Sequence, residues 1–397
     1  MIRTLVLALL ALAVTVIPAA ARPAPPLTIL ISIDGFRPDY LQRGVTPNLS
    51  ALARAGASGA MRPAFPSKTF PNHWTMVTGL SPDHHGIVAN RMVDPEGKRP
   101  PFAMAIEDPW WWQDGVPVWL AASRAGIRSA TEFWPGSTVD GLRAEDWNRF
   151  DARVPPDARV DVVLDWLRRP TPTRPRFVAL YFEAVDSAGH QFGPDSPEVG
   201  RAAALVDAAI GRLRQGLAGL RLRANLVIVS DHGMAALSPD RVIDLGSFAP
   251  AGDWTVVEDG PYVGLNAAPG HEAALAMSLA HPPAHVQCWP KAEIPARFRY
   301  GRNPRIPQFL CLADPGWLVL AKPPTSPVRG GNHGYENTAP EMQALFIGSG
   351  SGFRPGVRLA TFDNLAIEPL LRRLLGLPPG TNRDGTLAPV RRALRNR

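Results

Sequence analysis

The stretch LTILISID (27–34) is apolar almost throughout and ends in an acidic residue. Two later stretches likewise begin with an apolar run and end in acidic residues and histidine: FVALYFEAVDSAGH (177–190) and NLVIVSDH (225–232). Such continuous apolar runs are typical of parallel strands that are covered on both faces. In open α/β sheets, ligands bind outside the carboxyl ends of the strands. We therefore expect the polar residues at the ends of these runs to meet in one crevice. They are Asp34, Asp186, His190, Asp231 and His232.

Helical patterns separate the apolar runs. The segment TPNLSALARAG predicts a helix that begins after Thr46, has Pro47 in its first turn and stops at Gly56. We also expect helices near 69–79, over 157–169 and over 197–217, and another buried strand over 344–350. This alternation predicts an α/β fold with a doubly wound, mostly parallel sheet.

The composition divides the chain into segments. Residues 1–21 combine a basic start, an apolar stretch and a small-residue close, which is the layout of a cleavable secretory signal. An uncleaved membrane anchor is the alternative, but the apolar stretch is short for a membrane span. Residues 22–26 are a short linker. We assign 27–239 and 331–390 to one catalytic domain, and the proline-rich residues 240–330 to a small α+β insertion.

The predicted signal makes this an exported protein, periplasmic or secreted, with no membrane anchor after cleavage. Export permits a disulfide between the two cysteines, Cys288 and Cys311, although two separate buried thiols are the alternative. The formal charge is +7. No basic stripe is interleaved with aromatic residues, so we expect no nucleic-acid polymer as the main partner. The sequence leaves the oligomeric state open.

The acidic and histidine residues predict a metal centre. Three carboxylates in one crevice repel each other unless cations lie among them, and sets of Asp and His suit divalent metals such as zinc. Asp231 and His232 can face one ion if a turn follows the strand. Asp186 and His190 are expected on a turn made flexible by Gly189. The late His333, in HGY, completes a set of six ligands for two metal ions. Manganese, iron or cobalt could occupy similar sites.

A hydroxyl nucleophile is expected beside these metals. The segment FPSKTFPNHWTMVTG places Thr69 at the start of a helix, where free backbone N–H groups stabilise an anion. A metal on the Thr69 oxygen would lower its pKa and make it reactive at neutral pH. A helix cap alone is the alternative role for Thr69.

Several longer motifs resemble a known family. ISIDGFRPDYL, RPAFPSKTFPNHWTMVTGLSPDHHGIVAN, EAVDSAGHQFGP, SDHGM and GGNHGYEN resemble the nucleotide pyrophosphatase/phosphodiesterase family, which belongs to the alkaline phosphatase superfamily. The resemblance runs from about residue 27 to 375 and is thin across 240–325. It implies that Thr69 is a nucleophile that becomes phosphorylated. It further implies that Asn90 and the Thr69 N–H contact a phosphate oxygen.

The resemblance also implies how the metals are bound and which substrates are cleaved. Asp186, His190 and His333 match one zinc site, whereas Asp34, Asp231 and His232 match the other. Phe70 follows the nucleophile, and Phe150 matches a base-stacking aromatic of nucleotide-cleaving members. ATP would then yield AMP and pyrophosphate, and dinucleotides would yield mononucleotides. Core packing is the alternative role for both rings.

Two other functions stay open at this point. Relatives that cleave choline phosphoesters or lysophospholipids share the same metals. A protein that holds nucleotides at a metal centre without turnover is an alternative of another class. The run Trp110-Trp111-Trp112 either lines the mouth of the pocket or packs beside it.

Overall fold

The computed structural model describes residues 26–381 and 384–395. The predicted signal (1–21) and most of the predicted linker (22–26) lie outside the described residues. Within the described part, no helix is long and apolar enough to cross a membrane.

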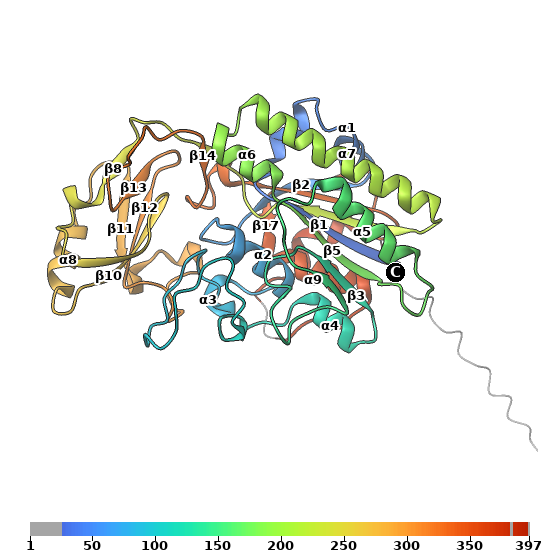
Figure 1. The fold of residues 1–397 in the computed structure, drawn as a ribbon, viewed down its shortest axis with the longest axis horizontal. Coiled ribbons are helices and arrows are strands. Elements are labelled where there is room, and N and C mark those ends of the chain that lie inside the picture. Colours follow the sequence, from blue (N-terminus) through green and yellow to red (C-terminus); the bar gives the residue numbers. More distant parts are fainter. Residues whose placement is uncertain (1–25, 382–383, 396–397) are drawn as a thin grey trace, which may run out of the picture.

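A nine-stranded sheet forms the centre of the molecule (Figure 1). Its strands follow the order β16 (Val357–Arg358), β2 (Ala57–Arg62), β15 (Ala344–Ser349), β6 (Ala224–Val229), β1 (Leu27–Ile33), β5 (Phe177–Phe182), β3 (Ser129–Glu132) and β4 (Asp146–Asn148), and β17 (Phe362–Asp363) also pairs with β2. The three predicted runs are β1, β5 and β6, which pair in parallel. The strand predicted over 344–350 is β15, which is antiparallel to both neighbours.

Helices cover both faces of this sheet. One face carries α1 (Pro47–Ala55), α5 (Pro156–Arg168), α6 (Ala184–Phe192) and α7 (Pro197–Gly219), and the other carries α2 (Thr69–Thr78), α4 (Val118–Arg124) and α9 (Ile367–Leu375), beside the short α3 (Pro82–His85). Along β1, Ile29 and Ile31 pack with the first group, whereas Leu30 packs with the second. The strand is thus buried on both faces, and the predicted doubly wound α/β fold is confirmed.

The helix boundaries follow local signals. Helix α1 begins at Pro47 and is followed by Gly56, as predicted. Helix α2 begins at Thr69 and ends before Gly79, which has a φ of 71°. A left-handed residue after the last turn is the usual place for glycine, because a Cβ would be strained there.

The chain between β6 and β15 builds a second unit, coloured yellow and orange in Figure 1. It contains an antiparallel sheet of β9 (Trp254–Glu258), β10 (Tyr262–Ala267), β12 (Phe309–Ala313) and β11 (Val286–Pro290), together with α8 (Glu272–Leu279), and a parallel pair of β8 (Val242–Asp244) and β13 (Leu318–Leu320). The outgoing and returning chain lie side by side, because β7 (Ala235–Ala236) pairs with β14 (Gly331–Asn332). The domain boundaries at 240 and 330 stay a prediction.

Cys288 and Cys311 face each other on the paired strands β11 and β12 and form a disulfide. Of the two alternatives that the sequence allowed, the disulfide is therefore the one present. The link closes a loop with a sequence separation of 23 residues.

We predict that replacing both cysteines by serine lowers the free energy of unfolding by about 3 kcal/mol, because the unfolded chain regains the freedom of the open loop. Chemical denaturation of the oxidised protein and of the double variant would measure this difference. Equal midpoints and slopes for the two proteins would show that the link contributes nothing.

Candidate active site

The candidate ligands gather at the carboxyl ends of the central strands. Asp34 follows β1 directly, Asp231 and His232 follow β6 after one residue, and His333 follows β14. Asp186 and His190 lie one turn apart on α6, just after β5. The structure therefore brings together all six residues that the sequence analysis named.

The prediction of a turn around Asp186 and His190 was wrong, because both lie in helix α6. Gly189, which suggested the turn, is a buried helical residue. A Cβ at this position would lie 3.0 Å from the Cε of Met234. The glycine thus permits close packing of the helix against Met234. The helix still places both side chains on one face, because they are four residues apart.

Each of the three carboxylates has one oxygen without a hydrogen-bond donor. These buried atoms are Oδ1 of Asp34, Oδ1 of Asp186 and Oδ2 of Asp231. The other oxygens of Asp34 and Asp231 accept hydrogen bonds from the Tyr181 hydroxyl (2.6 Å) and the Gly35 N–H (3.3 Å). A buried carboxylate oxygen without a partner is costly. The unpaired oxygens thus fit a site for cations.

The three histidines point their Nε2 atoms into this cluster. Nδ1 of His190, His232 and His333 donates to the carbonyl oxygens of Gly331 (2.9 Å), Gly233 (2.9 Å) and Ser67 (2.8 Å), respectively. A carbonyl can only accept, so the proton of each neutral ring is on Nδ1. Nε2 then carries a lone pair, and a backbone bond of this kind orients the histidine ligands of metals.

The distances between the Nε2 atoms and the carboxylate oxygens of the cluster are short for pairs of atoms that cannot form a hydrogen bond. Nε2 of His232 lies 2.9 Å from Oδ2 of Asp231 and 3.4 Å from Oδ1 of Asp34. Nε2 of His333 lies 3.1 Å from that of His190 and 3.8 Å from Oδ1 of Asp186. The His232 and His333 rings are stacked, with centroids 3.5 Å apart. Lone pairs that face each other this closely repel, and a cation between them would offset the repulsion.

His73 also approaches the cluster, since its Nδ1 lies 3.6 Å from Oδ2 of Asp231. Both of its nitrogens are already bonded, however. Nδ1 donates to the Thr69 carbonyl (2.8 Å), so Nε2 accepts from the Ser32 hydroxyl (2.8 Å). Burial lowers the pKa of His73 to about 3, so the ring stays neutral. His73 therefore packs and hydrogen-bonds inside the core, and neither nitrogen offers a free lone pair to the cluster.

The charges in the cluster perturb its titration. Burial, followed by the charges of Asp231 and Asp186, raises the pKa of Asp34 well above its ordinary value. Burial and the Asp186 charge raise the pKa of Asp231 to about 8. Burial also lowers the pKa of His333. Without cations, the fold therefore favours neutral side chains in this cluster.

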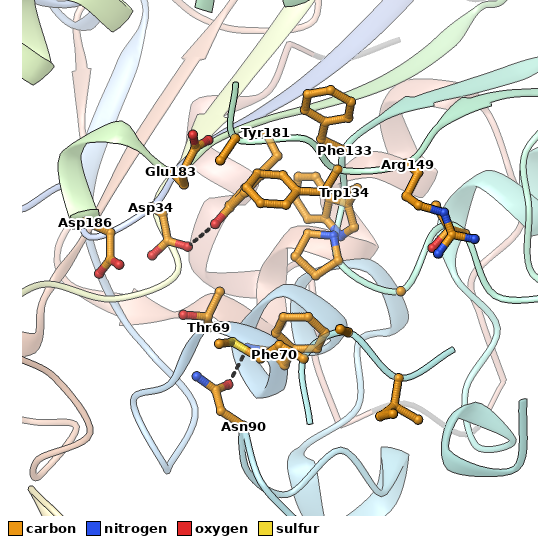
Figure 2. A pocket seen from close by; sticks show the side chains of 18 of the residues that line it. Asp34, Thr69, Phe70, Asn90, Phe133, Trp134, Arg149, Tyr181, Glu183 and Asp186 are labelled. Carbon is orange, nitrogen blue, oxygen red and sulfur yellow. Dashed lines mark hydrogen bonds between the residues drawn. The ribbon is translucent and has the colours of Figure 1, made fainter. Parts of the chain in front are cut away.

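Thr69 is the first residue of α2, and its Oγ1 lies 3.3 Å from Nε2 of His232. Next to it, Oδ1 of Asn90 accepts the Phe70 N–H (3.0 Å), as Figure 2 shows. This bond uses the amide oxygen, so the Asn90 NH₂ group is left to donate. The Thr69 N–H has no acceptor among the described residues, so it is also free to donate. Pro71, in the same first turn of the helix, has no N–H and adds no further donor. Two donors thus flank the Thr69 hydroxyl.

A cavity of about 620 Å³ opens beside these groups. Figure 2 shows Asp34 and Asp186 at one end and Arg149 at the other, with Thr69, Phe70 and Asn90 along one wall. Phe70 and Phe150 both line the cavity. Phe150 is 46% exposed, so its ring is available for contact with a ligand. Cavities of this size and aromatic lining hold small organic molecules.

The tryptophan run has both roles that the sequence left open. Trp111 and Trp112 are buried in the core. Trp112 also lines the cavity, and its ring centroid lies 6.0 Å from that of Phe70.

Sequence reasoning missed several residues of the site. Tyr181 lies inside the apolar run of β5, and its bond to Asp34 crosses to the neighbouring strand. A tyrosine in an otherwise aliphatic and phenylalanine-rich run was the available signal. Phe133, Trp134, Glu183 and Arg149 also line the cavity, and the sequence analysis gave none of them a role.

Solved structures show the same fold over most of the chain. Human ectonucleotide pyrophosphatase/phosphodiesterase 5 superposes with a TM-score of 0.88 at 31% sequence identity, covering 93% of this chain and 100% of that one. The inactive murine counterpart in complex with AMP superposes with a TM-score of 0.87 at 32% identity, with the same coverage. The fold is therefore alkaline phosphatase-like.

Sequence comparison narrows this class. The model of the type I phosphodiesterase / nucleotide pyrophosphatase family matches residues 28–336. An uncharacterized pyrophosphatase/phosphodiesterase of Schizosaccharomyces pombe is 38% identical over 92% of this chain and 80% of its own length. Bis(5'-adenosyl)-triphosphatase enpp4 of Xenopus laevis is 36% identical over 94% and 82%. The chain belongs to the type I phosphodiesterase / nucleotide pyrophosphatase family.

Other relatives are much longer. Human ectonucleotide pyrophosphatase/phosphodiesterase family member 1 is 36% identical over 94% of this chain, which spans only 42% of that protein. The similarity to such relatives is therefore a similarity to part of their length.

We predict that the metal-free protein loses stability between pH 7 and pH 8. Asp231 has its pKa raised from 3.8 to about 8, so in this window the folded chain holds a proton that the unfolded chain has released. Asp231 then lowers the stability by about 1 kcal/mol per pH unit as the pH rises. The raised pKa of Asp34 acts in the same direction. The lowered pKa of His333 acts with the opposite sign, but only up to the ordinary histidine value of 6.5.

Thermal unfolding in chelator at the two pH values would measure this slope. Asp231→Asn serves as the matched control and should make the slope less steep, because only the contribution of Asp34 remains. Added zinc should flatten the slope. A metal-free protein whose stability is constant or rises from pH 7 to pH 8 would contradict the burial of a protonated Asp231.

Proposed function

We propose that this protein is an exported two-zinc phosphodiesterase and nucleotide pyrophosphatase that works through a phospho-threonine intermediate. The observation that carries the proposal is the set of three buried carboxylate oxygens without donors, which face three histidine lone pairs beside the Thr69 hydroxyl. Family membership supports the reaction class. The description of a Thr-to-Ala murine relative as inactive supports a threonine nucleophile.

The donor set fits two zinc ions. Asp34, Asp231 and His232 would hold one, and Asp186, His190 and His333 the other. Zinc favours such nitrogen and oxygen ligands, and each histidine has the backbone contact typical of a bound ring. When bound, the pair would lower the pKa of the attacking hydroxyl and offset the charge that develops on both the attacking and the leaving oxygen.

The residues of the chain then carry out two displacements. The Thr69 hydroxyl gives up its proton to solvent and its oxygen attacks phosphorus. The bond to the leaving alcohol or pyrophosphate breaks, and the phosphate, with its remaining ester group, is held on Thr69. A water molecule then attacks the phospho-threonine and releases the product. Asn90 and the Thr69 N–H donate to one non-bridging oxygen, a contribution of a few kcal/mol when such donors are placed in advance. Two displacements predict net retention of configuration at phosphorus.

The aromatic side chains that line the cavity support a nucleotide as substrate. Phe70 and Phe150 would stack on the base, each stack contributing about 1–3 kcal/mol. The complex of the murine relative with AMP is consistent with this class of ligand. ATP would then yield AMP and pyrophosphate. Choline phosphoesters and lysophospholipids are competing substrates, and the measurements below separate them from nucleotides.

We predict that Thr69→Ala lowers turnover of bis-p-nitrophenyl phosphate at least about a thousandfold, because it removes the attacking oxygen. The variant should still bind two zinc ions, as measured by metal analysis. The wild-type protein should prefer this diester to p-nitrophenyl phosphate, lose activity in chelator and regain it with zinc.

Thr78→Ala is the matched control, since Thr78 lies at the other end of α2 and donates to the Trp74 carbonyl. Its turnover should stay close to that of the wild type. If Thr69→Ala retains activity, the phospho-threonine step is wrong. If the wild type binds zinc and AMP but cleaves neither ester, the alternative of a binding protein without turnover is correct.

We predict that Phe70→Ala and Phe150→Ala each raise KM for a nucleotide substrate about tenfold, since each removes one stacked ring. The KM for bis-p-nitrophenyl phosphate, which lacks a base, should change much less. Steady-state kinetics with thymidine 5'-monophosphate p-nitrophenyl ester would test this. Nucleotide turnover that is unchanged in both variants would exclude base stacking and favour a head-group diesterase.

A further inference from the structure

Arg159 is a buried arginine behind the wall of the cavity. It lies in α5, is 1% exposed and does not line the cavity. An isolated buried cation is costly unless it is paired and fully hydrogen-bonded. The partners of Arg159 therefore indicate what this side chain holds in place.

The guanidinium of Arg159 contacts the segment that leads to the metal cluster. It donates to both carboxylate oxygens of Glu183 (2.5 and 2.9 Å) and to the Tyr181 carbonyl (3.0 Å). Glu183 directly precedes α6, which carries Asp186 and His190. The Tyr181 hydroxyl donates to Asp34. One side chain is thus bonded to two residues that adjoin the metal cluster.

The same guanidinium also contacts the aromatic part of the cavity. Its central carbon lies 4.9 Å from the ring centroid of Phe133 and 5.8 Å from that of Phe150. The Phe150 ring packs by its edge against Phe133 at 5.7 Å and against Tyr181 at 5.9 Å. Arginine on the face of an aromatic ring is attractive, more so when water is excluded. Figure 2 shows Glu183, Tyr181 and Phe133 along one side of the cavity.

Phe133 needs such support because its backbone has a φ of 65°. A bulky residue in the left-handed region is strained and persists only where its surroundings determine it. The ring contacts with Arg159 and Phe150 provide these surroundings. Arg159, which is hydrogen-bonded to residues beside the metal cluster, therefore also stabilises the strained part of the cavity wall.

We propose that Arg159 is a positioning residue that fixes the Phe133–Phe150 wall relative to the metal cluster and thereby sets the preference for nucleotides. This inference rests on the proposed function. A nucleotide spans both parts of the cavity, so its binding depends on the distance between them. A small diester occupies the metal end alone and does not depend on that distance. Lysine cannot replace arginine here, because it lacks the planar fork that bonds Glu183 and stacks on the rings.

The test is Arg159→Lys, assayed with thymidine 5'-monophosphate p-nitrophenyl ester and with bis-p-nitrophenyl phosphate. We expect KM for the nucleotide to rise about tenfold and kcat/KM for the small diester to change less than about threefold. AMP affinity, measured by calorimetry on the zinc-loaded protein, should fall by the same factor as KM rises. Arg212→Lys is the control, since Arg212 makes a similar two-bond pair with Asp161 but is exposed and outside the cavity.

A double-mutant cycle separates positioning from general stability. If Arg159 acts through the aromatic wall, then adding Arg159→Lys to Phe150→Ala should raise KM by less than about twofold. Equal losses on both substrates, or a full tenfold loss on top of Phe150→Ala, would overturn the proposal.

Should Arg159→Lys fail to fold, Arg159→Gln keeps an N–H donor for the Tyr181 carbonyl or the Glu183 carboxylate and leaves Glu183 itself unchanged. It is expected to show the same selective loss. A different result would contradict the proposed function, namely that the wild-type protein cleaves neither substrate. The AMP affinities of the wild type and the variants still test the role of Arg159 in that case.

Discussion

The mutual repulsion of three carboxylates, each with a buried oxygen, is the constraint on which the rest of this structure depends. Asp34 and Asp231 follow the strands β1 and β6, Asp186 lies in the helix that follows β5, and the parallel pairing of these strands brings the three together. Each carboxylate satisfies only part of its hydrogen-bonding capacity within the chain. The fold alone leaves the cluster short of positive charge, so its chemistry and its stability are linked through cation binding.

The surroundings of the cluster hold each group by contacts from distant parts of the chain. Ser67, just before the helix of Thr69, binds His333, and Gly331 binds His190. Ser67 of the main unit thus orients a histidine that arrives from the second unit, and Gly331 of the returning chain orients a histidine of the main unit. Movement of one support would change the direction of a lone pair as well as the position of a ring. Preorganisation of this kind is what metal centres and oxyanion sites require.

The sequence predicted the elements whose signals are local. Strands β1, β5 and β6 are continuous apolar runs, and α1 and α2 have proline and glycine at their ends, so their class and boundaries followed from the residues. Helix α6 was missed, because Gly189 is indistinguishable in sequence from a turn glycine, and its packing against Met234 is a tertiary contact. Tyr181 and Arg159 were missed for the same reason, since their partners lie on other elements. The six candidate ligands could be named in advance because they lie at or soon after the ends of strands, and the strands were predictable. Their role as metal ligands stays a prediction.

The late return of His333 has a consequence for the order in which the site is assembled. Roughly 300 residues separate it from Asp34, and closing so long a loop has an entropic cost that the packed fold must offset. During synthesis, the first carboxylate is made long before the last imidazole, with the second unit in between. A growing chain therefore holds an incomplete set of ligands for most of its elongation. The six candidate ligands come together only when both units of the fold have formed around them, so binding of metal at this cluster would report that the chain has reached its native topology.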